Sequence, residues 1–395
     1  TAAVAAAAAV GLAAGYNNGL GTVPPRGWST WSTDDYSGLL DYCAETEVQQ
    51  IADAMVSSGM AAVGYNLVLL DDCWAATTRD AAGNLQPDPT RFPSGIPALV
   101  SYIHSRGLKL GLYTCAGPTT CKNNRTGSGG HYAADAAQFA AWNVDYVKMD
   151  NCGLSAPGPW VYSGIFPGYM NATGDAMWFA AGNWGEDAPW NWAPAIAQSY
   201  RAGPDHLPFW SFPGTPSGQG VIDVINNFAG INAASGVFGW ADPDFLTTGI
   251  FTMSLTESQS EFAMWAIFGG PMIVSTDVRN MSAWMAGVVL NTDILAINND
   301  SAVEPGVRVY NDNTTAMTQV WAKPLASGEQ AVVLLNANDW TTQTITVDWT
   351  MLGWPATANV SVYDCWAHAY LGAFVGSVSA PVVSHGNAMY RLRQL

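Results

Sequence analysis

The stretch VDYVKMD, residues 144–150, decides how this chain is interpreted. Its apolar side chains fall on both sides of the run, which indicates a strand buried on both faces, as in a parallel sheet covered by helices. The run nevertheless ends in two charged residues, Lys148 and Asp150. We therefore ask whether other strands of the chain end in the same way.

Seven further apolar runs occur before residue 300, at 26–31, 65–72, 108–117, 177–184, 199–205, 237–245 and 271–277. Between them, apolar residues spaced three and four apart predict amphipathic helices, for example at 45–60, 95–107, 132–143 and 257–270. Eight strand–helix units over roughly 250 residues are what a (β/α)8 TIM barrel requires. The predicted fold class is therefore α/β.

The pattern changes after residue 303. Short alternating runs bounded by Asn, Gly and Pro occupy 316–325, 329–338, 342–350, 358–366 and 385–395, and predict a C-terminal antiparallel β-sandwich. We expect residues 1–16 to be a signal-peptide remnant or N-terminal extension, 17–302 to form the barrel domain, and 303–395 to form the C-terminal antiparallel β domain.

The composition narrows the choice of partners. The chain has 14 basic and 31 acidic residues, a formal charge of −17, so phosphate backbones and anionic lipid surfaces are repelled. We expect no nucleic acid partner and no membrane insertion. Eighteen tryptophans and fifteen tyrosines suit a protein that stacks on sugar rings, although core packing explains most of them.

Three weak signals point to the secretory pathway. The start is rich in small apolar residues, the chain has six cysteines, and six Asn-x-Ser/Thr acceptor sequences begin at Asn124, Asn171, Asn280, Asn299, Asn313 and Asn359. Together they predict a secreted or vacuolar/lysosomal protein. Six cysteines allow fifteen pairings, and the sequence does not choose among them.

Polar and aromatic residues end most of the predicted barrel strands. They are Trp31, Asp71, Asp72, Tyr113, Lys148, Asp150, Asn183, Trp184, Arg201, Asp205, Asp242 and Asp244. Any single Asp among them has an alternative role as a helix N-cap. A set spread over most of the predicted strands instead predicts one shared pocket at the carboxyl ends of the strands, where barrels carry their chemistry.

The residue types in this pocket favour one kind of reaction. No Cys/His spacing suggests a metal site, no glycine-rich phosphate loop follows a strand, and no G-x-S-x-G turn is present. Two carboxylates flanking an acetal carbon are the minimum machinery for glycoside hydrolysis. Asp71 and Asp72 would accept hydrogen bonds from sugar hydroxyls, and Trp31 or Trp184 would contact the ring.

Several blocks together resemble glycoside hydrolase family 27, the α-galactosidase and α-N-acetylgalactosaminidase family. They are PPRGWSTW (24–31), LLDDCW (69–74), LGLYTCAG (110–117), DYVKMDNC (145–152), GNWGEDAPWNWA (182–193) and WADPDF (240–245). The match runs from about residue 17 to the C terminus. It implies a barrel followed by a β domain, no cofactor, and double displacement with retained anomeric configuration.

The resemblance also implies roles for individual residues. Asp150 matches the nucleophile, with Lys148 helping to lower its pKa, and Asp205 matches the acid/base, four residues after Arg201. The residues expected to line the sugar site are Trp31, Asp71, Asp72, Tyr113, Lys148, Asn183, Trp184, Glu186, Arg201 and Asp244. Of these, Asn183 and Glu186 would face the 2-position of the sugar.

Disulfides Cys43–Cys73 and Cys121–Cys152 match the family pattern, whereas Cys115 and Cys365 have no assignable partner. Two departures stand out. Gly182 replaces a Cys found in many relatives, and the segment 206–220, which follows Asp205, is unusually rich in aromatic residues and proline.

The prediction is a retaining exo-α-galactosidase that acts on a carbohydrate substrate as a monomer or homodimer, without metal or cofactor. The alternatives are a relative of other specificity (β-L-arabinopyranosidase, α-N-acetylgalactosaminidase or α-glucan hydrolase) and a non-catalytic sugar-binding or structural protein.

Overall fold

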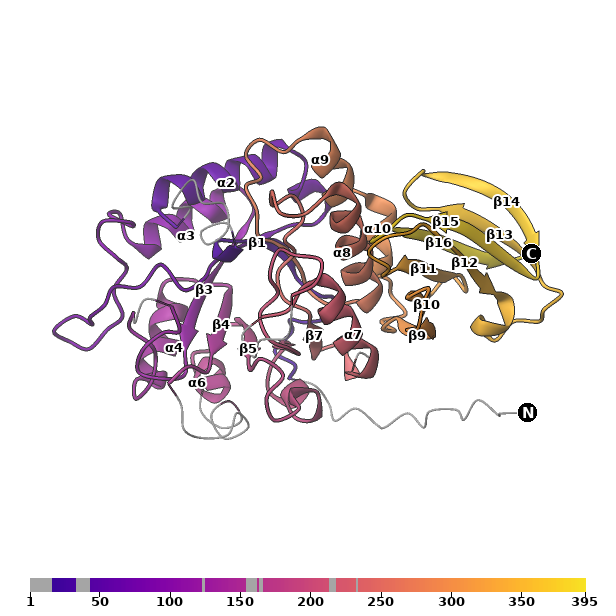
Figure 1. The fold of residues 1–395 in the computed structure, drawn as a ribbon. Coiled ribbons are helices and arrows are strands. Elements are labelled where there is room, and N and C mark those ends of the chain that lie inside the picture. Colours follow the sequence, from indigo (N-terminus) through magenta and orange to yellow (C-terminus); the bar gives the residue numbers. More distant parts are fainter. Residues whose placement is uncertain are drawn as a thin grey trace.

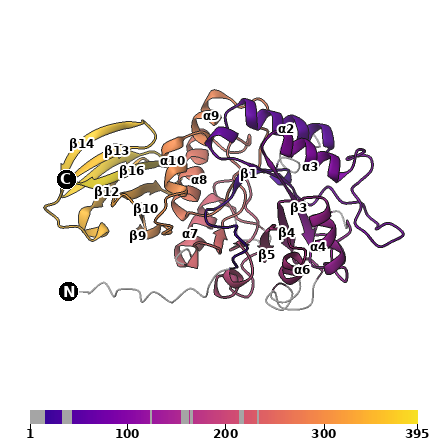
Figure 2. The ribbon, with the colours of Figure 1, turned by 180° about the vertical axis from the view of Figure 1, so that it is seen from behind.

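The computed structural model describes residues 16–32, 43–122, 125–153, 162, 166–212, 218–231 and 234–395. The chain folds into two parts, a barrel and a β-sandwich, which lie side by side (Figures 1 and 2). The predicted sequon at Asn124 lies outside the described residues. Within these ranges, no helix is long and apolar enough to cross a membrane.

Eight parallel strands form one curved sheet in the order β7-β6-β5-β4-β3-β2-β1-β8. They are β1 Arg26–Ser29, β2 Leu67–Leu70, β3 Lys109–Cys115, β4 Tyr146–Asp150, β5 Trp178–Gly182, β6 Ser199–Arg201, β7 Trp240–Asp242 and β8 Met272–Val274. The sheet closes next to β7, where the Leu246 N–H donates to the Ile273 carbonyl at 2.8 Å and the Ser275 N–H donates to the Leu246 carbonyl at 2.8 Å. The predicted TIM barrel is confirmed.

Alternate residues of each barrel strand face opposite environments, because side chains alternate along a strand. One set, including Leu67, Leu69, Tyr146, Trp178 and Trp240, forms its own buried cluster. The other set, such as Val68 and Val147, packs in the large core shared with the helices. The first set has the same parity as Asp71, Asp150 and Asp242, so these strand ends also turn inward.

The helices surround the barrel. They are α2 Glu45–Ser57, α3 Ile96–Ser105, α4 Tyr132–Ala141, α6 Phe166–Ala172, α7 Val221–Ile231, α8 Leu255–Phe268, α9 Ala283–Val289 and α10 Thr292–Asn298. Helix α8 begins with a capping box, in which the Ser254 hydroxyl accepts from the Glu257 N–H and the Glu257 carboxylate accepts from the Ser254 N–H. Helix α8 is buried along ten of its residues because it lies between the barrel and the sandwich (Figure 1).

The C-terminal part contains a six-stranded antiparallel sheet, β14-β13-β16-β11-β10-β9, and a two-stranded sheet, β12-β15. The strands are β9 Val307–Asp312, β10 Thr318–Pro324, β11 Gln330–Asn336, β12 Gln343–Asp348, β13 Asn359–Asp364, β14 Ala369–Val375, β15 Ser377–Val382 and β16 Asn387–Gln394. A separate apolar core, including Val320, Val332, Trp349 and Val362, joins them.

Three of these strands were not among the predicted runs. Strands β9 and β14 are the two edges of the larger sheet, and most of their residues are exposed or only partly buried. Strand β15 contains Pro381, which argues against a strand in a sequence pattern. The five predicted runs became β10, β11, β12, β13 and β16.

Gly27 provides a test of how closely the barrel strands pack. A Cβ placed there would lie 2.3 Å from the Leu67 carbonyl oxygen of β2, whereas a Cβ at Gly168 of α6 meets nothing within 4 Å. Gly27→Ala should therefore lower the free energy of unfolding by about 1–3 kcal/mol or more. Gly168→Ala, the control, should be neutral or slightly stabilising. Equal midpoints of urea unfolding for the two variants would contradict this packing.

Candidate active site

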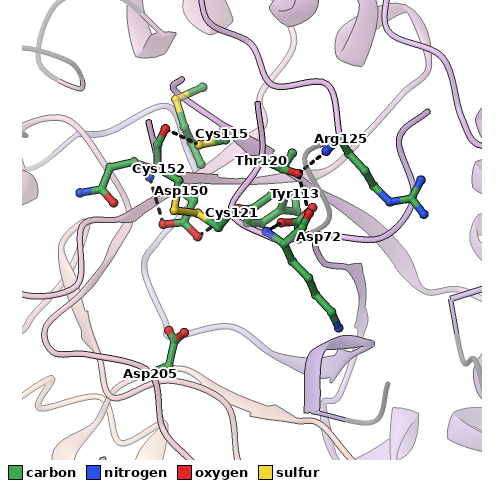
Figure 3. Close-up of a disulfide and its surroundings, with 12 residues drawn as sticks. Asp72, Tyr113, Cys115, Thr120, Cys121, Arg125, Asp150, Cys152 and Asp205 are labelled. Atoms are coloured by element: carbon green, nitrogen blue, oxygen red, sulfur yellow. Dashed lines mark hydrogen bonds between the residues drawn. A yellow bond between two sulfur atoms is a disulfide. The ribbon is translucent and has the colours of Figure 1, made fainter. Parts of the chain in front are cut away.

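Asp150, at the end of β4, is buried at the centre of the cluster of inward-facing strand ends. One carboxylate oxygen, Oδ2, accepts a hydrogen bond from the Tyr113 hydroxyl at 3.1 Å, and the other, Oδ1, accepts from the Asn151 N–H at 3.0 Å. Figure 3 shows the Asp205 carboxyl group directed toward that of Asp150. Asp150 ends β4 and Asp205 lies four residues after the end of β6. These two strands flank β5, so both acids lie at the same end of the barrel.

Lys148 lies one inward position before Asp150. Its ammonium group contacts Asp71 Oδ2 at 2.8 Å and lies 4.6–5.8 Å from the ring centres of Phe245, Tyr113 and Trp31. Burial alone would favour the neutral amine, but the charges of Asp71, Asp244 and Asp150 together outweigh it, and the pKa of Lys148 is raised. Lys148 therefore stays a cation inside the barrel.

Arg201, at the end of β6, is the second buried cation. It contacts Asp205 Oδ1 at 3.1 Å and Asp244 Oδ2 at 2.9 Å, and it donates to the carbonyl oxygen of Pro204 at 2.8 Å. Asp244 has a left-handed backbone, with φ +82°, and its N–H donates to Asp242 Oδ1 at 2.9 Å. This tight turn after β7 brings Asp244 back over Arg201.

The two disulfides hold the segments beside Asp72. Cys43 is joined to Cys73, the residue after Asp72, and Cys121 is joined to Cys152, two residues after Asp150. Between them, the Lys122 N–H donates to Asp72 Oδ2. The loop that carries Cys121 and Lys122 contacts Asp72. The bond between Cys121 and Cys152 links this loop to the end of the strand that carries Asp150 (Figure 3).

Three side chains here could be mistaken for a metal site. The ligand-type atoms of Cys121, Asp150 and Cys152 lie within 4.8 Å of one another. The two sulfur atoms are joined in a disulfide, so neither is the thiolate that binds a metal. The remaining cysteines, Cys115 and Cys365, are free and buried.

The loop after β5 is held against the end of β4 without a disulfide. Asn151 Nδ2 donates to Asn183 Oδ1 at 3.4 Å and to Glu186 Oε2 at 3.1 Å. A Cβ at Gly182 would lie 2.9 Å from the Met149 carbonyl oxygen, so the two strands meet closely at this point. Glu186 is exposed, Asn183 is buried, and half-buried Trp184 has a left-handed backbone, with φ +51°.

Asn151 was missed by the sequence reasoning, although it belongs to the DNC motif beside Asp150. His206 was also missed. This buried residue directly follows Asp205, and its N–H donates to Asp244 Oδ2 at 2.7 Å. An Asn or a His in a loop can equally well lie on the surface or support a buried site. Only the contacts in the structure show that Asn151 and His206 do the latter.

Burial raises the pKa of four carboxyl groups at the strand ends, those of Asp72, Asp150, Asp205 and Asp242. The pKa of Asp150 rises to about 6 because burial, together with the neighbouring Asp205, outweighs the lowering effect of Lys148. Lys148 lowers the pKa of Asp150, as expected from the sequence, but the net shift is upward. Burial also raises the pKa of Asp72 to about 7, and it raises the pKa of Asp205 despite Arg201.

A barrel with paired inward carboxyls at its strand ends and a separate β-sandwich defines a class, the two-domain barrel glycosidases. Residues 23–300 match the family model for alpha galactosidase A, and residues 315–392 match the model for the alpha galactosidase C-terminal beta sandwich domain. The chain belongs to this α-galactosidase family, glycoside hydrolase family 27.

Individual relatives agree with this assignment. The chain is 39% identical to an alpha-galactosidase of Coffea arabica over 377 residues, 95% of each protein. It is 37% identical to an alpha-galactosidase of Oryza sativa, over 95% of this chain and 86% of that protein. The crystal structure of alpha-galactosidase I from Mortierella vinacea superposes with a TM-score of 0.89 at 32% identity, covering 95% of this chain and 98% of that one.

Proposed function

We propose that this protein is a retaining exo-α-galactosidase that releases terminal α-linked galactose by double displacement. The observation that carries the proposal is the pairing of two carboxyl groups that face each other at the strand ends, that of buried Asp150 and that of half-buried Asp205. Each has a different neighbourhood: Asp150 is bonded to Tyr113 and Asn151, and Asp205 to Arg201. Different surroundings suit a nucleophile and an acid.

In the first step, ionised Asp150 attacks the anomeric carbon while protonated Asp205 gives its proton to the leaving oxygen. The Tyr113 hydroxyl and the Asn151 N–H hold the Asp150 carboxylate in one orientation. The raised pKa of Asp205 favours the protonated form that this step needs. A covalent galactosyl–Asp150 intermediate results.

In the second step, Asp205 acts as a base on the water that attacks the same carbon. Once Asp150 is esterified, it no longer carries a negative charge. Because the Asp150 charge and the Asp205 charge oppose one another's ionisation, esterification makes loss of the Asp205 proton easier. Two inversions at one carbon retain the anomeric configuration.

The remaining inward residues suit recognition of the sugar. Asp72 Oδ1 and Asp244 Oδ1 are buried and have no hydrogen-bond partner among the described residues, so each can accept from a sugar hydroxyl. Asp71, Asp72 and Lys148 would bind the 4- and 6-hydroxyls, and Arg201 and Asp244 the 2- and 3-hydroxyl side. Trp31, beside Lys148, offers an apolar surface to the ring.

We also propose a secreted or vacuolar/lysosomal location, with carbohydrate as the partner and no cofactor. Two disulfides fit an oxidising compartment. Five of the sequon asparagines are exposed, which suits glycosylation: Asn171, Asn280, Asn299, Asn313 and Asn359.

Removing the nucleophile tests the central assignment. Asp150→Gly should abolish hydrolysis of an aryl α-galactoside, and azide should restore aryl release because it occupies the vacated space and attacks the anomeric carbon directly. The product should be the β-galactosyl azide, identified by NMR. Azide added to the unmodified enzyme should give no β product. Failure of azide to restore any activity would count against Asp150 as nucleophile.

The pH dependence tests the charge state of Asp150. Since the attacking form is ionised and the pKa of Asp150 is about 6, kcat/KM should fall as the pH drops through about 6. Lys148→Met removes the cation that lowers this pKa, so the acid limb should move to higher pH. Lys323→Met, which removes a buried lysine of β10, should leave the limb in place. An acid limb unmoved in Lys148→Met would contradict this account.

Specificity at the 2-position is tested with nitrophenyl glycosides. Asn183 and Glu186 are bulky and are fixed beside Asp150 by Asn151, so an acetamido group would clash at a cost of about 1–3 kcal/mol. The α-galactoside should therefore react far faster than the α-N-acetylgalactosaminide, and Asn183→Ser with Glu186→Ala should narrow the difference.

The ratio of α-galactoside to β-L-arabinopyranoside cleavage serves as an internal control, because these sugars differ at the 6-hydroxymethyl group rather than at the 2-position. It should not change in the double variant. Equal kcat/KM values for the galactoside and the acetamido sugar in the unmodified enzyme would contradict the assignment of Asn183 and Glu186 to the 2-position. The proposed roles of Asp150 and Asp205 would not be affected.

A further inference from the structure

The segment after Asp205 is folded back on itself. Gln219 N–H donates to the Asp205 carbonyl at 2.8 Å, and Leu207 N–H donates to the Gln219 carbonyl at 2.7 Å. Farther along, Ile222 N–H donates to the Trp210 carbonyl at 2.9 Å. The backbone from Asp205 to Trp210 is therefore one hydrogen-bonded unit with the start of α7, and a displacement of Trp210 would be passed to Asp205.

A residue of the sandwich holds the far end of this unit. The indole of Trp210 is 6% exposed, and the imidazole of His385, in the turn between β15 and β16, stacks on it with 4.3 Å between ring centres and 14° between planes. The stack joins the two domains, because Trp210 belongs to the segment after β6 and His385 of the sandwich also contacts Glu257 of α8.

Three polar contacts fix His385 itself. Its Nδ1 lies 2.8 Å from Glu257 Oε1 at the start of α8, and its Nε2 lies 2.9 Å from Asp339 Oδ1 in the turn after β11. The Ser260 hydroxyl donates to its carbonyl at 2.6 Å. Ionised carboxylates only accept hydrogen bonds, so both ring nitrogens can be satisfied only in the imidazolium form. An imidazolium on an indole face also gains a cation–π attraction.

We propose that His385, a residue of the C-terminal sandwich, positions the acid/base Asp205 for proton donation by clamping Trp210. The inference rests on the proposed role of Asp205. His385 does not touch the substrate site and is a positioning residue. The clamp gives Trp210, in the aromatic segment after Asp205, a positioning role, and it lets a residue of the sandwich influence the orientation of the acid/base.

The test uses the dependence of the rate on the leaving group. Acid assistance matters for melibiose, which has a poor leaving group, and little for 2,4-dinitrophenyl α-galactoside, whose leaving group departs without a proton. His385→Ala should lower kcat/KM for melibiose by roughly tenfold or more, since small displacements of a catalytic group are costly. It should leave kcat/KM for the dinitrophenyl galactoside nearly unchanged. A merely structural role would lower both equally.

His368→Ala is the matched control. His368 also joins the sandwich to the barrel through a carboxylate, Asp293 of α10, at 2.7 Å. It lies in the turn between β13 and β14, and its contact is with α10 rather than with the segment after Asp205. This variant should leave the ratio of the two kcat/KM values unchanged. A shift equal to that of His385→Ala would overturn the proposal.

Asp205→Ala, measured in parallel, separates the two hypotheses. If it leaves the ratio unchanged, the acid/base assignment fails. If it shifts the ratio and His385→Ala does not, the clamp alone is wrong. Should His385→Ala not fold, Asp339→Ala removes one contact at the more exposed end of the clamp, and the ratio must shift in the same direction for the proposal to stand.

Stability supplies a second readout. Partial burial lowers the pKa of His385, but its hydrogen bonds to Glu257 and Asp339 outweigh this, and the pKa is raised. A raised pKa stabilises the fold below the ordinary histidine range and loses this effect as the pH rises through the folded-state value. The difference in Tm between the unmodified protein and His385→Ala should thus be larger at pH 5 than at pH 9. A difference independent of pH would contradict the imidazolium clamp.

Discussion

Two buried cations, Lys148 and Arg201, allow several carboxylates to be buried together at the carboxyl ends of the barrel strands. Isolated carboxylates are not stable inside a protein unless they are paired or protonated. Lys148 compensates Asp71, and Arg201 compensates Asp205 and Asp244 at the same time. Burial still raises the pKa of Asp150 and Asp205. The compensation is thus partial, and an acid with a raised pKa is what proton donation near neutral pH requires.

The barrel makes this concentration of charge possible. Side chains at alternate positions point inward, so the strand that contributes Tyr146 to the apolar interior presents Lys148 and Asp150 at its end. The apolar layer below excludes water, and the loops above supply the hydrogen bonds from Asn151 and Lys122. The same geometry therefore stabilises the fold and strengthens the electrostatic interactions of the site.

The loops that complete the site are held by different means on different sides. Disulfides fix the segments beside Asp72 and Asp150. The loop after β5 lacks such a bond and is held by Asn151, with Gly182 allowing close approach of the strands. The segment after β6 is held from outside the barrel, by His385 of the sandwich. Each of these contacts ties a segment that lies beside the inward carboxyl groups to another part of the chain.

The sequence by itself determined the barrel and the sandwich, because apolar periodicity is a local property of the chain. It also indicated that the polar residues at the strand ends lie together, because their positions relative to the apolar runs are local as well. It did not reveal the edge strands β9 and β14, whose exposed residues lack that periodicity. Nor did it show that the pKa of Asp150 is raised, since burial and the charge of Asp205 depend on residues far along the chain. The stacking of His385 on Trp210 joins positions 175 residues apart, and only tertiary structure decides such a contact because neither residue is distinctive until the two domains meet.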